Sequence, residues 1–188
     1  MRYLIVCGGK TDKEFGLNEI KTDGKDAIIA ADSGMDFLYE NDVTPDIIVG
    51  DFDSATTKAL EYFERKGQTE IHRLNPIKDD TDTEYAIRLA IREGARSIVM
   101  LGATGSRIDH VLGNISLLGI GLESGTDISI IDTNNRIRMA DRPVTIEKSA
   151  QYGRFVSLIA VTDDNEVSLR GFKYPVTDYS FDRFTSLG

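Results

Sequence analysis

The segment 44–54, Thr-Pro-Asp-Ile-Ile-Val-Gly-Asp-Phe-Asp-Ser, is the stretch from which the fold can be read. Its apolar centre, residues 47–49, is a β-branched run typical of a buried strand. Gly50 and two acids, Asp51 and Asp53, follow at once, and a stretch of helical character comes next. A buried strand that passes through a polar loop into a helix is the repeating unit of a parallel α/β sheet.

The same unit repeats over the first two thirds of the chain. Short apolar, β-prone runs alternate with stretches of helical periodicity. The expected strands are 3–7, 27–31, 46–49, 69–73, 97–101 and 127–131, and the expected helices are 34–41, 55–66, 81–94 and 107–123. The polar, Gly-interrupted segment 10–25 is expected to be a loop with room for a short helix. This alternation predicts an α/β fold with a mostly parallel, Rossmann-like sheet and helices on both faces.

The character of the sequence changes after about residue 134. Helical periodicity is lost, and short β-prone runs are separated by turn-rich pieces such as 162–165 and 170–175. The expected strands here are 143–147, 155–161, 166–170 and 176–181. We therefore predict two domains, an α/β domain over 1–134 and a small antiparallel β domain over 135–188.

The composition of the chain excludes some classes of function. The 188 residues include 31 acidic and 22 basic side chains, for a formal net charge of −9. Nucleic-acid binding generally needs clustered Lys and Arg, and no such cluster is present. An acidic chain that binds a phosphorylated substrate needs a divalent cation as mediator. The single cysteine, Cys7, excludes an internal disulfide, and its apolar surroundings predict a buried core residue.

The N-terminal apolar run is too short for a signal peptide or a membrane span, and no other segment is long enough. We expect a cytoplasmic protein that binds neither membranes nor nucleic acid.

Two acidic loops are candidates for a metal site. In the first, Asp53 or Ser54 can cap the following helix, but a cap needs only one side chain. Two carboxylates about 4 Å apart repel by roughly 4 kcal/mol at an effective dielectric near 20, and bound Mg²⁺ would turn this repulsion into attraction. The second loop, Lys78-Asp79-Asp80-Thr81-Asp82-Thr83-Glu84, contains more acids than the capping pair of Thr81 and Glu84 explains.

A third loop, Gly102-Ala103-Thr104-Gly105-Ser106-Arg107-Ile108-Asp109-His110, suits an anion. Its glycines allow close backbone approach, and the N–H groups before the helix, from Gly105 and Ser106 onward, attract phosphate. Arg107 adds a forked donor, and His110 can line the site. All three loops leave strands at the carboxyl edge of the sheet, where α/β proteins bind ligands. Together they predict a site for a cation and a polyphosphate.

Five segments in order resemble the bacterial thiamine pyrophosphokinase family. They are Ala-Asp-Ser-Gly at 31–34, the opening segment at 44–54, and segments 78–86, 102–114 and 169–176. The resemblance implies transfer of a pyrophosphoryl group from ATP to the hydroxyl of thiamine, giving thiamine diphosphate and AMP. It further implies a thiamine-binding β-sandwich over 135–188 and a homodimer with sites at the subunit interface.

The resemblance also implies roles for individual residues. Asp51, Asp53 and Asp82 would hold Mg²⁺, and Asp79, Thr81 and Arg107 would lie near the phosphates or the reacting hydroxyl. Asp109 matches the acid that follows the arginine in the family motif. Members of the family usually continue beyond the Thr-Ser-Leu-Gly segment at 185–188, so the β domain is expected to lack its closing strands.

The expected reaction is in-line attack of the thiamine hydroxyl on the β-phosphorus of ATP. Mg²⁺ would orient the polyphosphate, and Arg107 would stabilise the developing charge. The proton acceptor is one of Asp51, Asp79 and Asp82, and the sequence does not choose among them. Two alternatives stay open. One is a Mg²⁺-dependent phosphatase, or a nucleotidyl or sugar-nucleotide transferase, that uses the Asp-x-Asp loop, and the other is a non-catalytic module that binds thiamine or a nucleotide.

Overall fold

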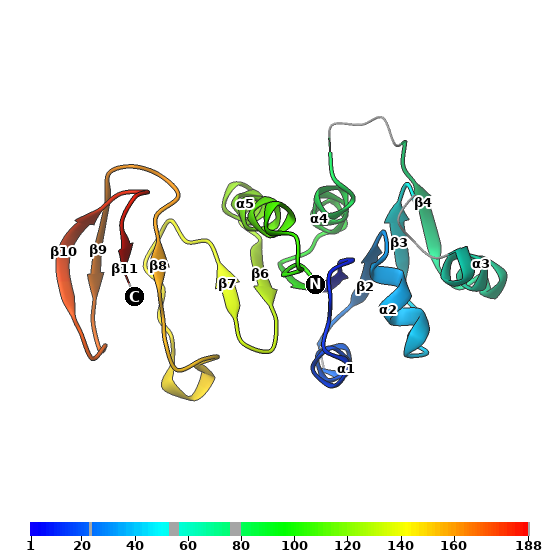
Figure 1. Cartoon of the computed structure of the whole chain (residues 1–188), viewed down its shortest axis with the longest axis horizontal. Coiled ribbons are helices and arrows are strands. Elements are labelled where there is room, and N and C mark those ends of the chain that lie inside the picture. Colours follow the sequence, from blue (N-terminus) through cyan, green and yellow to red (C-terminus); the bar gives the residue numbers. More distant parts are fainter. Residues whose placement is uncertain (23, 53–56, 76–79, 188) are drawn as a thin grey trace. The chain divides into compact units, whose positions relative to one another are not determined.

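The computed structural model describes residues 1–22, 24–52, 57–75 and 80–187. The chain divides into two compact units, Met1–Thr145 and Ile146–Gly188. Within these described residues, the first unit contains a seven-stranded sheet with five helices, and the second contains short β-strands (Figure 1). The α/β fold class predicted from the sequence is confirmed.

The sheet of the first unit has the strand order β4-β3-β2-β1-β5-β6-β7. Its strands are β1 (Arg2–Val6), β2 (Ala27–Ala31), β3 (Ile47–Gly50), β4 (Glu70–Arg73), β5 (Ser97–Leu101), β6 (Asp127–Ile131) and β7 (Arg136–Arg138). All pairings are parallel except that of β7 with β6. The chain winds from β1 toward β4 and then crosses back to β5, so the direction of winding switches between β1 and β5. That switch point is where doubly wound sheets bind ligands.

Strand β7 was not expected from the sequence, because Arg-Ile-Arg offers only one apolar residue to a strand pattern. It forms a hairpin with β6 in which Ile137 lies opposite Ile130. The expected domain boundary at 134/135 falls between these two strands, whereas the compact units divide at 145/146.

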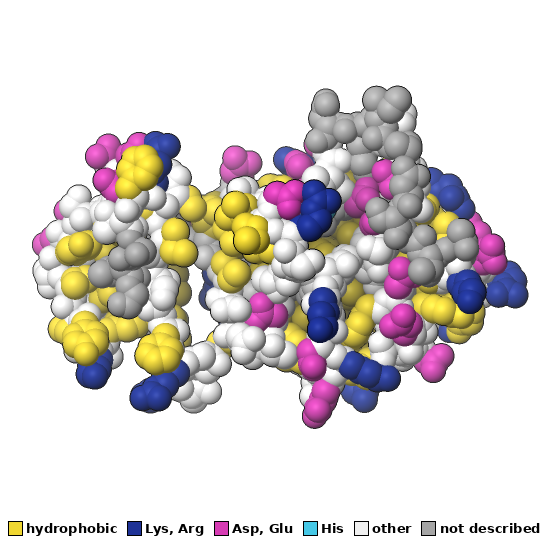
Figure 2. Space-filling model, viewed as in Figure 1, with side chains coloured by type: hydrophobic (Ala, Val, Ile, Leu, Met, Phe, Trp, Pro, Cys, Tyr) yellow, Lys and Arg dark blue, Asp and Glu magenta, His cyan; other side chains and the backbone are white. Residues whose placement is uncertain are grey.

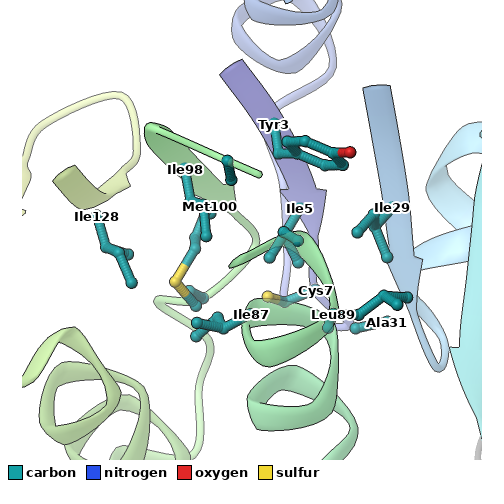
Figure 3. Packing of buried hydrophobic residues seen from close by; sticks show 14 of the residues in the cluster. Tyr3, Ile5, Cys7, Ile29, Ala31, Ile87, Leu89, Ile98, Met100 and Ile128 are labelled. Atoms are coloured by element: carbon teal, nitrogen blue, oxygen red, sulfur yellow. The ribbon is translucent and has the colours of Figure 1, made fainter. Parts of the chain in front are cut away.

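Helices cover both faces of the sheet. They are α1 (Lys13–Lys21), α2 (Gly34–Glu40), α3 (Thr57–Lys66), α4 (Asp82–Arg92) and α5 (Ile108–Ser124). Helices α4 and α5 lie on one side and α1 on the other (Figure 1). Buried side chains of α1, α2 and α3 share one core cluster with Leu4 and Val6, and those of α4 and α5 share the other with Tyr3 and Ile5 (Figure 3).

These two clusters explain why the central strands read as unbroken apolar runs. Successive side chains of β1 alternate between the two faces, and each face is covered by helices. Leu4, Ile5 and Val6 are at most 2% exposed. Complete burial of such a side chain contributes roughly 1.5–3 kcal/mol.

Segment 10–25 was expected to be a loop with room for a short helix, and that helix, α1, occupies nine of these residues. Asp12 caps this helix by accepting a hydrogen bond from the backbone N–H of Phe15 at 2.9 Å. Gly16 suggested a helix break, but it is buried, and a Cβ there would lie 2.7 Å from the ring of Phe37. The glycine therefore permits close packing of α1 on α2.

In the part of the second unit that the structure describes, the strands form two antiparallel pairs. Strands β9 (Asn165–Leu169) and β10 (Val176–Phe181) form one pair, and β8 (Leu158–Ile159) and β11 (Ser186–Leu187) form the other. The antiparallel character is confirmed. No strand forms at the expected 143–147, the expected strand at 155–161 shortens to β8, and a short 3₁₀ helix, η1, spans Lys148–Ala150.

Apolar side chains stay exposed in this unit, among them Phe155 and Phe184 at 82% and 90%. Among the residues that the structure describes, no helix is long and apolar enough to cross a membrane. On the face seen in Figure 2, Lys and Arg side chains lie among Asp and Glu rather than in one basic patch.

Candidate active site

Three carboxylates gather at the carboxyl edge of the sheet. Asp32 follows β2, Asp51 follows β3, and Asp82 is the first residue of α4. One oxygen from each lies within 4.8 Å of the other two, and all three residues are half-buried. The strand order explains the meeting, since β2 and β3 are neighbours with Ala31 opposite Val49.

The backbone at this edge adopts conformations that side-chain-bearing residues rarely take. Asp32 has φ of 47° and Phe52, directly after Asp51, has φ of 64°. The backbone N–H of Asp32 donates to the carbonyl of Val49 at 2.8 Å, which fixes one turn against the end of β3. Non-glycine residues in the left-handed conformation cost free energy and cluster at functional sites. Two of them beside one carboxylate cluster therefore indicate that this edge of the sheet is a functional site.

The start of α4 holds Asp82 in place. The Thr81 hydroxyl accepts a hydrogen bond from the backbone N–H of Glu84 at 3.1 Å, as the capping pattern predicted. The Glu84 carboxylate pairs with Arg88 rather than with the backbone N–H of the cap residue. It accepts a hydrogen bond from Arg88 Nε at 2.8 Å, one turn further along the helix.

The glycine-rich loop after β5 packs closely on the end of β1. The backbone N–H of Gly9 donates to the carbonyl of Gly102 at 2.9 Å. Gly102 has φ of 66°, and a Cβ there would lie 2.4 Å from the carbonyl oxygen of Cys7. Only glycine fits this position, because both the conformation and the space exclude a side chain. The loop therefore closes over the switch point between β1 and β5.

Arg107 precedes α5, and its side chain is 68% exposed. It forms a forked ion pair with Asp109, with Nη2–Oδ2 at 2.6 Å and Nε–Oδ1 at 3.3 Å. The hydrogen bond from Arg107 lowers the pKa of the Asp109 carboxyl, and the same bond raises the pKa of Arg107. His110 Nε2 lies 3.9 Å from Asp109 Oδ2, so these three residues form one exposed group beside the loop.

A cavity of about 500 Å³ opens beside the glycine-rich loop. Its walls come from α1 and the segment before it, from the loops after β5 and β6, and from the ends of these two strands. The lining residues are Lys10, Thr11, Asp12, Phe15, Leu101, Gly102, Thr104, Gly105, Ser106, Ile131, Asp132, Thr133 and Asn134. Gly105 and Ser106, which the sequence suggested as anion-binding positions, are among them.

The structure brings together some of the site residues expected from the sequence. Asp51 and Asp82 meet in the carboxylate cluster. Asp53 and Asp79, together with Lys78, lie outside the described residues. Thr81 caps α4, and Arg107, Asp109 and His110 form the exposed group before and at the start of α5.

Asp32 was not among the candidate site residues that the sequence suggested. Its position could have indicated it, since Asp32 comes directly after the apolar run 27–31, much as Asp51 comes after the run 47–49 and Gly50. Cys7, in contrast, is the core residue that was expected. The Thr83 hydroxyl contacts its sulfur at 3.8 Å, and burial raises the pKa of the thiol to about 12. It is therefore not a nucleophile at neutral pH.

The fold and the site together define a class of protein. A doubly wound sheet with carboxylates and a glycine-rich loop at its switch edge is typical of enzymes that act on phosphorylated ligands.

Comparison with known families identifies the class more closely. Residues 20–130 match the family model described as thiamin pyrophosphokinase, catalytic domain, and residues 143–188 match thiamin pyrophosphokinase, vitamin B1 binding domain. The chain belongs to the thiamin pyrophosphokinase family, whose activity is transfer of pyrophosphate from ATP to thiamine.

Individual relatives belong to the same family. The chain is 35% identical over 176 residues to thiamine pyrophosphokinase of Bacillus subtilis, covering 93% of this chain and 81% of that protein. The crystal structure of a Bacillus subtilis thiamine pyrophosphokinase matches with a TM-score of 0.83 at 29% identity, over 98% of this chain and 86% of that one. That of Geobacillus thermodenitrificans matches with a TM-score of 0.79 at 29% identity, over 99% and 87%.

Proposed function

We propose that this chain transfers a pyrophosphoryl group from ATP to the hydroxyl of thiamine, giving thiamine diphosphate and AMP, and that the carboxylate cluster is its metal site. The observation that carries the proposal is the meeting of Asp32, Asp51 and Asp82 within 4.8 Å, in a chain whose two parts match the two family models.

The donor set of this cluster suits Mg²⁺. Three carboxylates offer hard oxygen ligands, and they are close enough to repel one another strongly without a cation. Asp51 and Asp82 are the ligands that the sequence suggested, and Asp32 joins them. When bound, Mg²⁺ supplies neutralisation of the charge on the polyphosphate and holds it in one orientation.

The remaining chemistry belongs to side chains around this edge. Arg107, exposed and forked, binds phosphate oxygens and stabilises the charge that develops on them during transfer. Gly105 and Ser106 line the cavity beside it and offer backbone close to the donor nucleotide. One of Asp51, Asp79 and Asp82 accepts the proton of the thiamine hydroxyl. Asp109 keeps the guanidinium of Arg107 oriented until the donor arrives.

We further propose that the second unit binds thiamine and that the chain forms a homodimer. The family model over 143–188 carries the name vitamin B1 binding domain, which supports thiamine binding by the second unit. A homodimer is supported by α5, whose residues Ile108 and Leu112 are 71% and 59% exposed. A cytoplasmic location stays a prediction from the sequence.

The decisive experiment measures AMP release from ATP and Mg²⁺ with and without thiamine. We expect AMP and thiamine diphosphate in equal amounts, only when thiamine is present, and none when EDTA removes the metal. AMP formed without thiamine would overturn the proposal. Family membership does not favour the phosphatase or the binding module; a trapped phospho-aspartate would support the first, and binding of thiamine and ATP without turnover the second.

A further inference from the structure

One carboxylate organises the turn between β6 and β7. The Oδ1 atom of Asp132 accepts hydrogen bonds from the backbone N–H groups of Asn134 at 2.8 Å and Asn135 at 2.7 Å. The Asn135 side-chain amide lies 3.0 Å from Oδ1 and 3.1 Å from Oδ2. The backbone N–H of Asp132 in turn donates to the carbonyl of Asn135 at 3.0 Å. The turn is therefore built around this side chain.

The same carboxylate reaches a loop 28 residues away in sequence. The Thr104 hydroxyl donates to Asp132 Oδ2 at 2.8 Å. Thr104 lies in the glycine-rich loop, between Gly102 and Arg107, and both Thr104 and Asp132 line the cavity beside that loop. The hydrogen bond thus joins two walls of the cavity across the neighbouring strands β5 and β6.

The charge of Asp132 strengthens this link. Burial, the largest single influence, opposes ionisation, but the hydrogen bonds from Asn134, Asn135 and Thr104 together hold the pKa of the carboxyl below its usual value. A carboxylate is a stronger acceptor than a neutral group, so a charged Asp132 restrains the Thr104 hydroxyl firmly. On its other side the loop is tied to α5, where Asn114 Nδ2 donates to the carbonyl of Ala103 at 2.9 Å.

We infer that Asp132 is a positioning residue for the donor nucleotide: through Thr104 it fixes the glycine-rich loop, and with it the wall of the cavity from which Gly105 and Ser106 meet the nucleotide. The inference rests on the proposed function for the identity of the ligand. Asp132 need not touch ATP for this role, since its oxygens are already engaged by the turn and by Thr104.

The test compares Thr104→Val, which removes the hydroxyl at nearly constant volume, with Thr104→Ser, which keeps it. In the ligand-free protein, we expect hydrogen exchange of the peptide containing 102–107 to accelerate about tenfold in Thr104→Val. In Thr104→Ser it should stay within about twofold of the wild type. In the thiamine-dependent assay, the KM for ATP should rise about tenfold in Thr104→Val while the KM for thiamine stays unchanged.

Thr69→Val is the matched control, because the Thr69 hydroxyl also donates at 2.8 Å, to the carbonyl of Pro45, but at the amino end of β4. It should alter neither the exchange of 102–107 nor the KM for ATP. A double-mutant cycle with Asp132→Ala separates positioning from direct ligand contact. If the two residues act through their shared hydrogen bond, Thr104→Val adds no further rise in KM to Asp132→Ala.

Two outcomes would overturn the inference: unchanged exchange in Thr104→Val, or effects on KM that multiply in the double variant. Failure of the proposed function looks different. In that case the wild type forms no AMP in response to thiamine, while the exchange rates still report whether the Thr104–Asp132 link orders the loop.

Discussion

Replacing Asp51 by Asn separates the proposed metal-binding role of the carboxylate cluster from the effect of the cluster on stability. Three carboxylate oxygens lie within 4.8 Å of one another. At that separation and an effective dielectric near 20, each charged pair repels by about 3.5 kcal/mol. Asp51→Asn removes two of the three pairs. Because water and counter-ions screen half-buried groups, we expect a net gain of about 1 kcal/mol in the free energy of unfolding without metal.

The same substitution removes a ligand from the proposed metal site. At a Mg²⁺ concentration of 100 Kd, binding stabilises a folded protein by about 2.7 kcal/mol, and tenfold weaker binding leaves about 1.4 kcal/mol. In EDTA, the variant should melt about 2–4 °C higher than the wild type, because the gain of about 1 kcal/mol from lost repulsion acts alone. The rise in melting temperature caused by Mg²⁺ should be about half that of the wild type. Turnover dependent on Mg²⁺ should be lost.

Thermal melts in EDTA and over a Mg²⁺ series, followed by circular dichroism, provide the measurement. Asp141→Asn is the matched control, because it makes the same charge change at an exposed residue after β7. It should leave the effect of Mg²⁺ unaltered. A lower melting temperature of Asp51→Asn in EDTA, together with an undiminished response to Mg²⁺, would refute a metal site built on repelling carboxylates.

Three further outcomes are expected. Arg107→Ala should lower the rate of AMP release at least about a hundredfold while the melting temperature changes little, because its ion pair with Asp109 is exposed; kinetics and melts on one preparation check both. Asp132→Ala should destabilise the protein at pH 7, as measured by urea unfolding. Since the pKa of Asp132 is lowered by folding, this difference is complete above the unfolded value of about 3.9 and shrinks as the pH falls through the folded value. The buried Cys7, whose thiol pKa is raised to about 12, should not react with a disulfide reagent at pH 8 until guanidinium unfolds the chain.

Much of the first unit was predictable because its strands are buried on both faces. Two runs, Leu4 to Val6 and 27–31, are apolar without interruption. Such unbroken apolar runs are typical of strands in a sheet that helices cover on both faces. The order of strands and helices followed from these runs. The sequence allowed only a short helix in place of α1, because Gly16 weakens the helical pattern there, whereas in the structure Gly16 permits close packing against Phe37. Such a role is visible only when both helices are in place.

The site was predictable in part for a similar reason. Strand ends of a parallel sheet share one edge, so Asp51 and Asp82 were expected to lie close together, and they do. Asp32 escaped notice because one aspartate after a strand is ordinary in a turn. Its position beside Asp51 depends on the pairing of β2 with β3, which no local sequence pattern contains. The β-strands of the second unit were harder to place, because short runs of alternating residues lack a strong hydrophobic signal.

The sequence by itself determined which segments are buried strands, which loops carry acids, glycines and an arginine, and to which family the chain is similar. These properties depend on hydrophobic burial and on local chemistry, both of which act along the chain. Only the tertiary structure decided that Asp32 joins Asp51 and Asp82, and that Asp132 holds Thr104 across two neighbouring strands. Such contacts join residues far apart in sequence, and they exist only because the strand order and the register of the sheet bring particular strand ends together.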